Sequence, residues 1–250
     1  MWQYRELIWN LTIADLKNRY QNTFLGFFWS LLSPLLLALV LYFVFRHLWG
    51  QEENFAINIV VGIMAWQFFS TGTSSSLRAI VSKSSLVTRV YIPRQILVLS
   101  NVLANLINFM LTFIVLLFII LVMLGHLPIT VLLFPLIHII YFWFIFGAGL
   151  LLSSLFVYFR DVNQIWEVLT RVLFFASPIF YPLSIVPANL MPYYLLNPIT
   201  QFIGMYRDVM VAGDLPSLYS IVVVASFTLA VYLVGSFTFN KLQRRFAEEM

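Results

Sequence analysis

The sequence predicts an all-α membrane protein with six transmembrane helices, an N-terminal amphipathic interface helix and a re-entrant outer segment between the fifth and sixth spans. Of its 250 residues, 62% are hydrophobic and only 10% are charged, which is more apolar surface than a soluble domain of this length can bury. Apolar runs of about one bilayer thickness recur along the chain and predict the spans. Before the last run, closely spaced prolines divide the chain into short pieces. We therefore expect a single transmembrane domain over residues 1–250, without an internal repeat.

Residues 1–22 are expected to form a cytoplasmic interface helix with two apolar stripes. One stripe comprises Tyr4, Leu7, Leu11 and Ala14, and the other comprises Trp2, Trp9, Ile13, Leu16 and Tyr20. A helix that lies on a membrane needs only one apolar face, so the second face indicates a protein partner, although a plain interfacial anchor is an equal alternative. The charges in this stretch and its lack of an apolar signal region predict that there is no cleavable signal peptide.

The apolar runs approach or exceed the roughly 20 residues that a span requires. The predicted spans are Phe27–Phe45, Ile57–Thr73, Ile96–Leu124, Val131–Tyr158, Val162–Tyr181 and Leu218–Phe239. Asp161 and Gln164 have the spacing of a capping box, which predicts that the fifth helix begins near Val162. Residues 182–216 are too apolar for a solvated loop and too often broken by proline to span, so we expect short helices that dip into the outer face.

Lysine and arginine predict the orientation of the chain. With the N-terminus inside, 11 of the 14 basic residues fall in inner segments. Such a positive-inside bias places the polar segment 82–94, the tail 240–250 and both termini on the cytoplasmic side of the membrane.

No catalytic centre is expected. The sequence has no Gly-x-x-x-x-Gly-Lys motif for binding nucleotide phosphates, and its 3 histidines lack the spacing of metal ligands. It has no cysteine, and the acidic residues expected outside are few and are not paired with a base or a nucleophile. We therefore expect no catalytic residue, metal site or cofactor. An integral membrane enzyme of envelope synthesis, the alternative from another class, would need clustered acids or histidines at one membrane face.

Polar residues inside the spans are candidates for function because they are costly in lipid. Glu167 and Arg171 can pair at i and i+4, and with Arg160 and Asp161 they form a candidate hinge or gate near the cytoplasmic mouth. A buried pair that fixes the packing of this helix is the favoured alternative. The third span carries a polar stripe that favours hydrogen bonding between helices over a hydrated path: Asn101, Asn105, Asn108 and Thr112.

Aromatic residues make up 18% of the chain, and most are expected to face lipid or pack between helices. A subset could offer flat apolar faces along which sugar rings slide, as aromatic side chains do for other polymers. The candidates for this role are Tyr42, Trp66, Phe69 and Phe174.

The sequence resembles the permease subunits of type-2 ABC transporters that export cell-surface polysaccharide, a family that includes the O-antigen, capsule and teichoic-acid exporters. DLKNRYQNTFLGFFWSLLSPLL (Asp15–Leu36) resembles the N-terminal signature of the family, and VTRVYIPRQIL (Val87–Leu97) resembles its cytoplasmic segment. FRDVNQ, SPIFYP, LNPIT and YRDVMVAGDLP are similar to its C-terminal half in order and spacing. The resemblance covers almost the whole chain.

The resemblance implies a homodimer in membrane lipid that moves a lipid-linked polysaccharide, with two copies of a separate ATPase subunit beneath it and no role for nucleic acid. It implies ATPase contacts by the interface helix, through Leu7 and Leu11, and by a coupling segment that contains Leu86, Val87, Arg89, Tyr91 and Arg94. Residues 183–216 would close the path between substrates. Drug and lipid exporters share the wider fold and are the alternative within transport. The resemblance identifies neither the polymer nor its lipid carrier.

Overall fold

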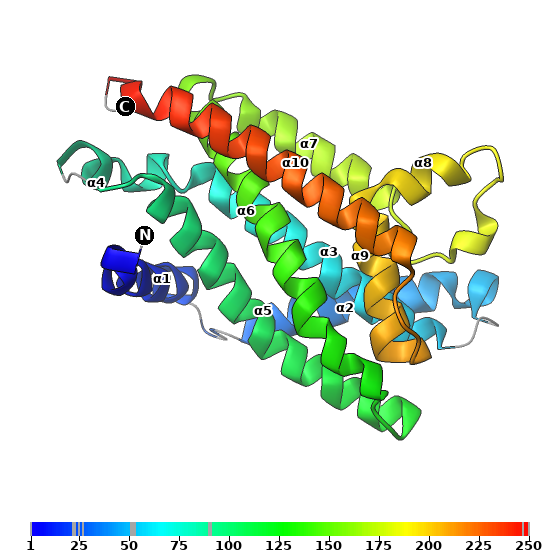
Figure 1. The fold of residues 1–250 in the computed structure, drawn as a ribbon. Helices are drawn as coiled ribbons and strands as arrows, with labels where there is room; N and C mark the ends of the chain where they lie inside the picture. Colours follow the sequence, from blue (N-terminus) through cyan, green and yellow to red (C-terminus); the bar gives the residue numbers. More distant parts are fainter. Residues whose placement is uncertain are drawn as a thin grey trace.

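The computed structural model describes residues 2–21, 24, 26, 28–50, 54–89, 92–246 and 248–249, and in these ranges the regular structure is helical (Figure 1). The long helices are α2 (Phe28–Trp49), α3 (Phe55–Arg78), α5 (Gln95–Leu124), α6 (Phe134–Tyr158) and α10 (Leu218–Leu242). The shorter ones are α1 (Arg5–Tyr20), α4 (Ser84–Arg89), α7 (Val162–Phe175), α8 (Met191–Leu196) and α9 (Pro198–Arg207). Short 3-10 turns lie at Trp2–Tyr4, Val81–Lys83, Ile129–Leu133, Leu183–Ile185 and Gln243–Arg245, and a π-helical turn, Asp208–Ala212, follows α9.

Five helical stretches in the described ranges are long and apolar enough to cross a membrane, and they confirm five of the predicted spans. These stretches are Phe28–Leu48, Phe55–Arg78, Gln95–Leu124, Ile129–Tyr158 and Leu218–Arg245.

The remaining predicted span, Val162–Tyr181, is shorter than the sequence suggested. α7 has 14 residues and is about 21 Å long, below the roughly 30 Å of a hydrocarbon core. The helix stops at Phe175 because Pro178 cannot donate a backbone hydrogen bond and restricts the residue before it. The chain then turns into the protein, where Ile179, Phe180 and Tyr181 are buried.

α3 is the central long helix of the bundle, with two thirds of its most apolar stretch buried by the helices around it (Figure 1). α6 and α10 lie side by side and approach closely because two glycines meet at their crossing. A Cβ atom built on Gly235 of α10 would lie 2.1 Å from the carbonyl oxygen of Gly147 in α6. Small residues at such a crossing let two backbones make van der Waals contact, which is a main source of helix association in lipid.

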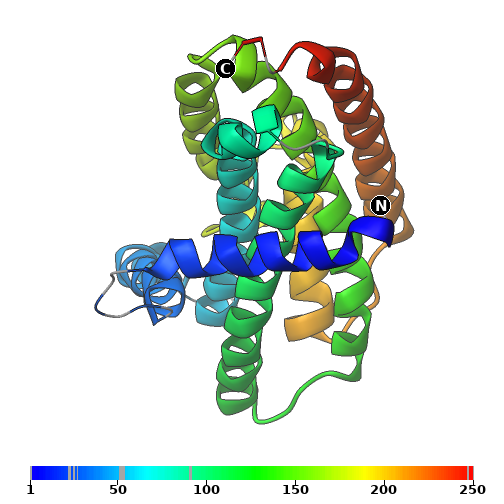
Figure 2. The same ribbon diagram turned by 90° about the vertical axis from the view of Figure 1, so that its left-hand side faces the viewer.

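α1 lies across the bundle, roughly perpendicular to α5 (Figure 2). Its buried face runs through Thr12, which is fully buried, and Asp15, whereas Trp9 is 58% exposed. This face lies between the two predicted apolar stripes. Thr12 donates to the Ile8 carbonyl of its own helix at 2.7 Å, and Asp15 pairs with Lys83 at 2.6 Å, so polar side chains occupy this face.

The proline-rich region forms short helices, as predicted. The side chain of Asn197 accepts a hydrogen bond from the Ile199 amide at 3.0 Å and begins α9, with Pro198 in the first turn, where its missing N–H costs nothing. α9 is inserted among α3, α6 and α10, and its buried side chains include Phe202, Ile203 and Tyr206.

Candidate functional site

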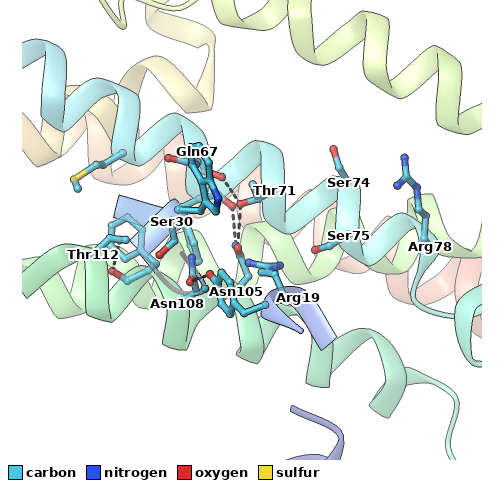
Figure 3. A pocket seen from close by; sticks show the side chains of 16 residues that line it. Arg19, Ser30, Gln67, Thr71, Ser74, Ser75, Arg78, Asn105, Asn108 and Thr112 are labelled. Carbon is cyan, nitrogen blue, oxygen red and sulfur yellow. Dashed lines mark hydrogen bonds between the residues drawn. The ribbon is translucent and has the colours of Figure 1, made fainter. Parts of the chain in front are cut away.

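A cavity of about 470 Å³, here called the polar cavity, lies where the end of α1 and the start of α2 meet α3 and α5 (Figure 3). Apolar side chains also line it: Trp29, Met64, Phe68 and Phe109. Its polar lining consists of Arg19, Ser30, Gln67, Thr71, Ser74, Ser75, Arg78, Asn105, Asn108 and Thr112. Among the described residues that line it, none is acidic, and two are arginines. Charges and amides gathered between membrane-spanning helices are costly unless they serve packing or function, so this cavity is the leading candidate site.

Asn105 connects the two helices that form the floor of the cavity. Its Nδ2 atom donates to the Phe68 carbonyl at 2.9 Å, and its Oδ1 atom accepts from Thr71 Oγ1 at 3.0 Å. A Cβ atom on Gly72 would lie 2.7 Å from Asn105 Nδ2, so the bond requires glycine there. The predicted hydrogen bonding between helices is confirmed for this position, and the same polar stripe also lines a cavity.

Two of the other polar residues of the cavity, Tyr20 and Arg78, lie at the ends of helices. Tyr20, at the end of α1, donates to Asn108 Oδ1. Arg78, in the last turn of α3, donates from Nε to Asn163 Oδ1 of α7 at 3.0 Å. Figure 3 shows Arg19 beside the Asn105 and Asn108 side chains, with Arg78 further along α3. The cavity therefore carries excess positive charge and adjoins α7.

A second polar cluster joins α1 to the predicted coupling segment. Lys83 Nζ lies 2.6 Å from Asp15 Oδ2, and the side chains of Lys83 and Asp15 are only 14% and 12% exposed. Ser100 of α5 donates to the same carboxylate oxygen at 3.4 Å. Because the partners are far apart in sequence, no local spacing revealed this cluster. It ties three segments of the chain together at one point.

Of the predicted coupling residues, Leu86 and Val87 pack against the core of the bundle, with Val87 only 5% exposed. Arg94 donates to the Gln243 carbonyl and lies over the ring of Phe246, 5.8 Å from its centroid. In this structure Arg94 thus holds the C-terminal segment.

The remaining predicted ATPase contacts are only partly placed. The side chain of Arg89 and all of Tyr91 lie outside the described residues. Leu7 is half-buried, and Leu11 packs against the core. Their role toward an ATPase remains a prediction.

The candidate hinge residues lie at the start and along one side of α7. The Glu167 and Arg171 side chains pair at 2.7 Å, as predicted, but they are 56% and 73% exposed in the single chain. Asp161 occupies the position before the first helical residue without a hydrogen bond from its side chain to the helix, so the predicted capping box is wrong. Arg160 lies over the ring of Phe156, 5.3 Å from its centroid.

Two of the four candidate path aromatics are core residues of the chain, and the other two are partly buried. Phe69 is 2% exposed and Trp66 is 8% exposed, and their ring centroids are 5.5 Å apart. Phe174 is half-buried, with its centroid 5.6 Å from that of Trp66. Tyr42 lies against Phe55, centroid to centroid 6.2 Å. The contacts of Trp66 and Phe69 favour the packing alternative for these two.

A half-buried arginine that the sequence did not single out, Arg207, joins three segments at the opposite end of the bundle from the C-terminus. Arg207 Nη2 donates to the carbonyls of Asn58 at 3.0 Å and Ile179 at 2.7 Å. A Cβ atom on Gly62 would lie 2.6 Å from the same Ile179 carbonyl oxygen, so position 62 needs a glycine. Burial lowers the pKa of Arg207 to about 10, and the guanidinium therefore stays charged at neutral pH.

Within the described part of the chain, no group of three or more His, Asp and Glu side chains is placed to hold a metal ion. The long apolar helices of the described ranges define an integral membrane protein. Residues 6–211 match the family described as ABC-2 type transporter, and the chain belongs to that family.

Similar proteins include permeases of polysaccharide export. The O-antigen export system permease protein RfbA of Myxococcus xanthus is 32% identical over 256 residues, covering 100% of this chain and 97% of that protein. RfbA of Klebsiella pneumoniae is 30% identical, covering 97% and 94%. The capsule polysaccharide export inner-membrane protein CtrC of Neisseria meningitidis is 26% identical, covering 81% and 78%. These matches concern transport proteins and extend along most of both chains.

Proposed function

We propose that this chain is the membrane subunit of an ATP-driven exporter that moves a lipid-linked cell-surface polysaccharide, of the O-antigen or capsule type, across the inner membrane. The observation that carries the proposal is the nearly end-to-end similarity to permeases named for O-antigen export. The sequence has no phosphate-binding loop, so ATP is hydrolysed on a separate ATPase subunit, present in two copies. No chemistry occurs on the polymer; changes in conformation move it.

The functional unit is a homodimer in which α7 contributes to the subunit interface. One face of α7 packs inward through Trp166, Thr170 and Leu173. A neighbouring face exposes large apolar residues beside the charged pair: Ile165, Val168, Leu169, Val172 and Phe175. A second copy would cover that apolar face and partly desolvate Glu167 and Arg171, which then act as the hinge or gate.

The topology supports cytoplasmic termini and six crossings. α7 and the buried residues 177–181 together form a discontinuous fifth crossing, and non-helical backbone is tolerated at such depth when it is buried in protein. Residues 182–216 form the re-entrant outer region that closes the path. α1 lies in the cytoplasmic interface, where it and the segment 82–94 receive the motion of the ATPase.

Complementation tests the proposal. A host that makes the polymer but lacks its own permease should regain surface polysaccharide when this chain and its ATPase are expressed together. The purified permease alone should hydrolyse no ATP, and reconstitution with the ATPase should restore hydrolysis. Hydrolysis by the isolated permease would contradict the division of labour, and drug efflux without surface polymer would contradict the substrate class.

Cross-linking tests the interface. The chain has no cysteine, so Val168→Cys introduces a single thiol on the exposed face of α7. Oxidation should give a covalent dimer in the membrane, whereas the matched change Leu132→Cys, exposed on the turn before α6, should give none. Dimers from neither position or from both would argue against α7 as the interface.

A further inference from the structure

We propose that the polar cavity between α1, α3 and α5 binds the phosphate-bearing headgroup, a diphosphate or monophosphate, of the lipid that carries the polymer. The inference rests on the proposed function and adds to it a binding site and a ligand chemistry. A cavity whose lining includes two arginines is suited to receive the anionic headgroup of such a carrier.

The charge of the cavity favours an anion. Arg19 and Arg78 line it, and no described lining residue is acidic. Guanidinium groups bind phosphate through paired N–H donors more specifically than other cations do. Basic residues at helix C-termini also stabilise the helix dipole, which explains why Arg19 and Arg78 end their helices. That effect does not explain why hydroxyl and amide groups gather between them.

The neutral groups of the cavity complement a phosphate ester joined to sugar. Ser74, Ser75 and Thr71 supply hydroxyls along α3, and Asn108 supplies an amide from α5 (Figure 3). These groups can donate to phosphate oxygens and exchange hydrogen bonds with sugar hydroxyls. The volume of about 470 Å³ lies within the usual range for small-molecule sites.

An adjoining apolar hollow favours a lipid over a free phosphate. A shallow depression of about 780 Å³ lies between α1 and α5 and shares Tyr20 and Asn108 with the polar cavity. Its lining combines apolar side chains, which include Leu16, Ile107 and Leu111, with the polar side chains of Lys17, Asn18 and Gln21. A polar cavity for a headgroup beside an apolar trough for a hydrocarbon chain matches an amphiphile.

Thiol protection in the assembled permease–ATPase complex tests the site. Because the chain lacks cysteine, Ser74→Cys places a single permease thiol in the cavity, and its rate of alkylation reports occupancy. The probes are polyprenyl diphosphate in phosphatidylethanolamine vesicles, polyprenol in the same vesicles, and inorganic pyrophosphate in solution. Polyprenyl diphosphate should slow alkylation and polyprenol should not. Ser217→Cys, exposed at the start of α10, is the control thiol and should react equally with every probe.

Removing the charges should remove the protection. Arg19→Gln or Arg78→Gln should raise the half-protecting concentration of polyprenyl diphosphate at least about tenfold, the loss expected for a hydrogen bond to a charged group. Arg244→Gln changes an exposed arginine outside the cavity and should leave the half-protecting concentration unchanged. If the glutamine variants do not assemble with the ATPase, two measurements take their place. One is protection in the Arg78→Lys variant, and the other is the weakening of protection in the wild type as salt is added.

The outcomes distinguish a failure of the proposed binding site from a failure of the proposed export function. Equal protection by polyprenol and polyprenyl diphosphate, or undiminished protection in both glutamine variants, overturns the site while export continues in the wild type. Protection by pyrophosphate as strong as by the lipid keeps the anion site but assigns it to a soluble ligand. A complex that neither exports polymer nor shows protection overturns the proposed function itself.

Discussion

The crossing of α6 and α10 gives a stability prediction that can be worked from the structure. Gly235→Ala would place a Cβ atom 2.1 Å from the Gly147 carbonyl oxygen, whereas carbon–oxygen contacts begin at about 3.3 Å. The helices must therefore separate by roughly 1 Å at this point. The obstructing atom is backbone, so no side-chain rotation relieves the clash. We expect a loss of about 3 kcal/mol, the upper part of the range for overpacking, because neighbouring contacts along the crossing also weaken.

Thermal unfolding of the purified permease in one detergent measures this loss. A change of about 3 kcal/mol should lower the Tm by roughly 6–12 °C in a chain of this length. The matched control is Gly204→Ala in α9, where an added Cβ meets nothing within 4 Å. That change should be neutral or should stabilise the protein by about 0.4–1 kcal/mol by restricting the unfolded chain. If Gly235→Ala unfolds at the wild-type temperature, the two helices do not cross at these glycines.

Four further predictions follow from the contacts described above. Arg207→Met should lower the free energy of unfolding by about 3 kcal/mol, because buried carbonyls lose a charged donor, and increased hydrogen exchange after α7 would show it. Exchanging the charges of Asp15 and Lys83 should preserve more complex assembly than either single reversal, measured by co-purification with the ATPase, whereas purely additive losses would mean that the pair is not coupled. Phe69→Ala should reduce folded yield and export in the same proportion, with a cost of about 3–5 kcal/mol, and loss of export at normal yield would restore the path interpretation. Asp161→Ala should change stability by less than about 0.5 kcal/mol, because its side chain makes no capping bond, and a larger drop in Tm would contradict the observed geometry.

The sequence was sufficient for the parts of the fold that depend on local pattern. Five long apolar runs became five long helices, because in lipid each backbone polar group must be satisfied within its own segment. Pro178 shows where local pattern fails. The apolar run continues past it, so composition predicts a span, but the missing N–H ends the helix and the following residues fold inward.

The candidate site was less predictable because it depends on partners far apart in the chain. The stripe through Asn105 was visible as a period along one helix, yet nothing in that period showed that Arg19 would lie beside it. Lys83 and Asp15 likewise each read as an ordinary charge in an amphipathic segment. The burial of Phe69, which favours packing over a role in the path, was not predictable for the same reason, since a single span does not show which of its faces other helices will cover.

The contact of Arg207 with Asn58 and Ile179 has a consequence for how the chain is made. Asn58 leaves the ribosome long before Ile179 and Arg207, and the arginine emerges last. Until then the two carbonyl groups have no guanidinium to bind, and the end of α3 beside Gly62 cannot close against the turn after α7. Sealing of this end of the bundle is therefore a late step of biogenesis that waits for the last third of the chain, and nascent chains that stop before Arg207 should remain open there to water and to quality-control proteases.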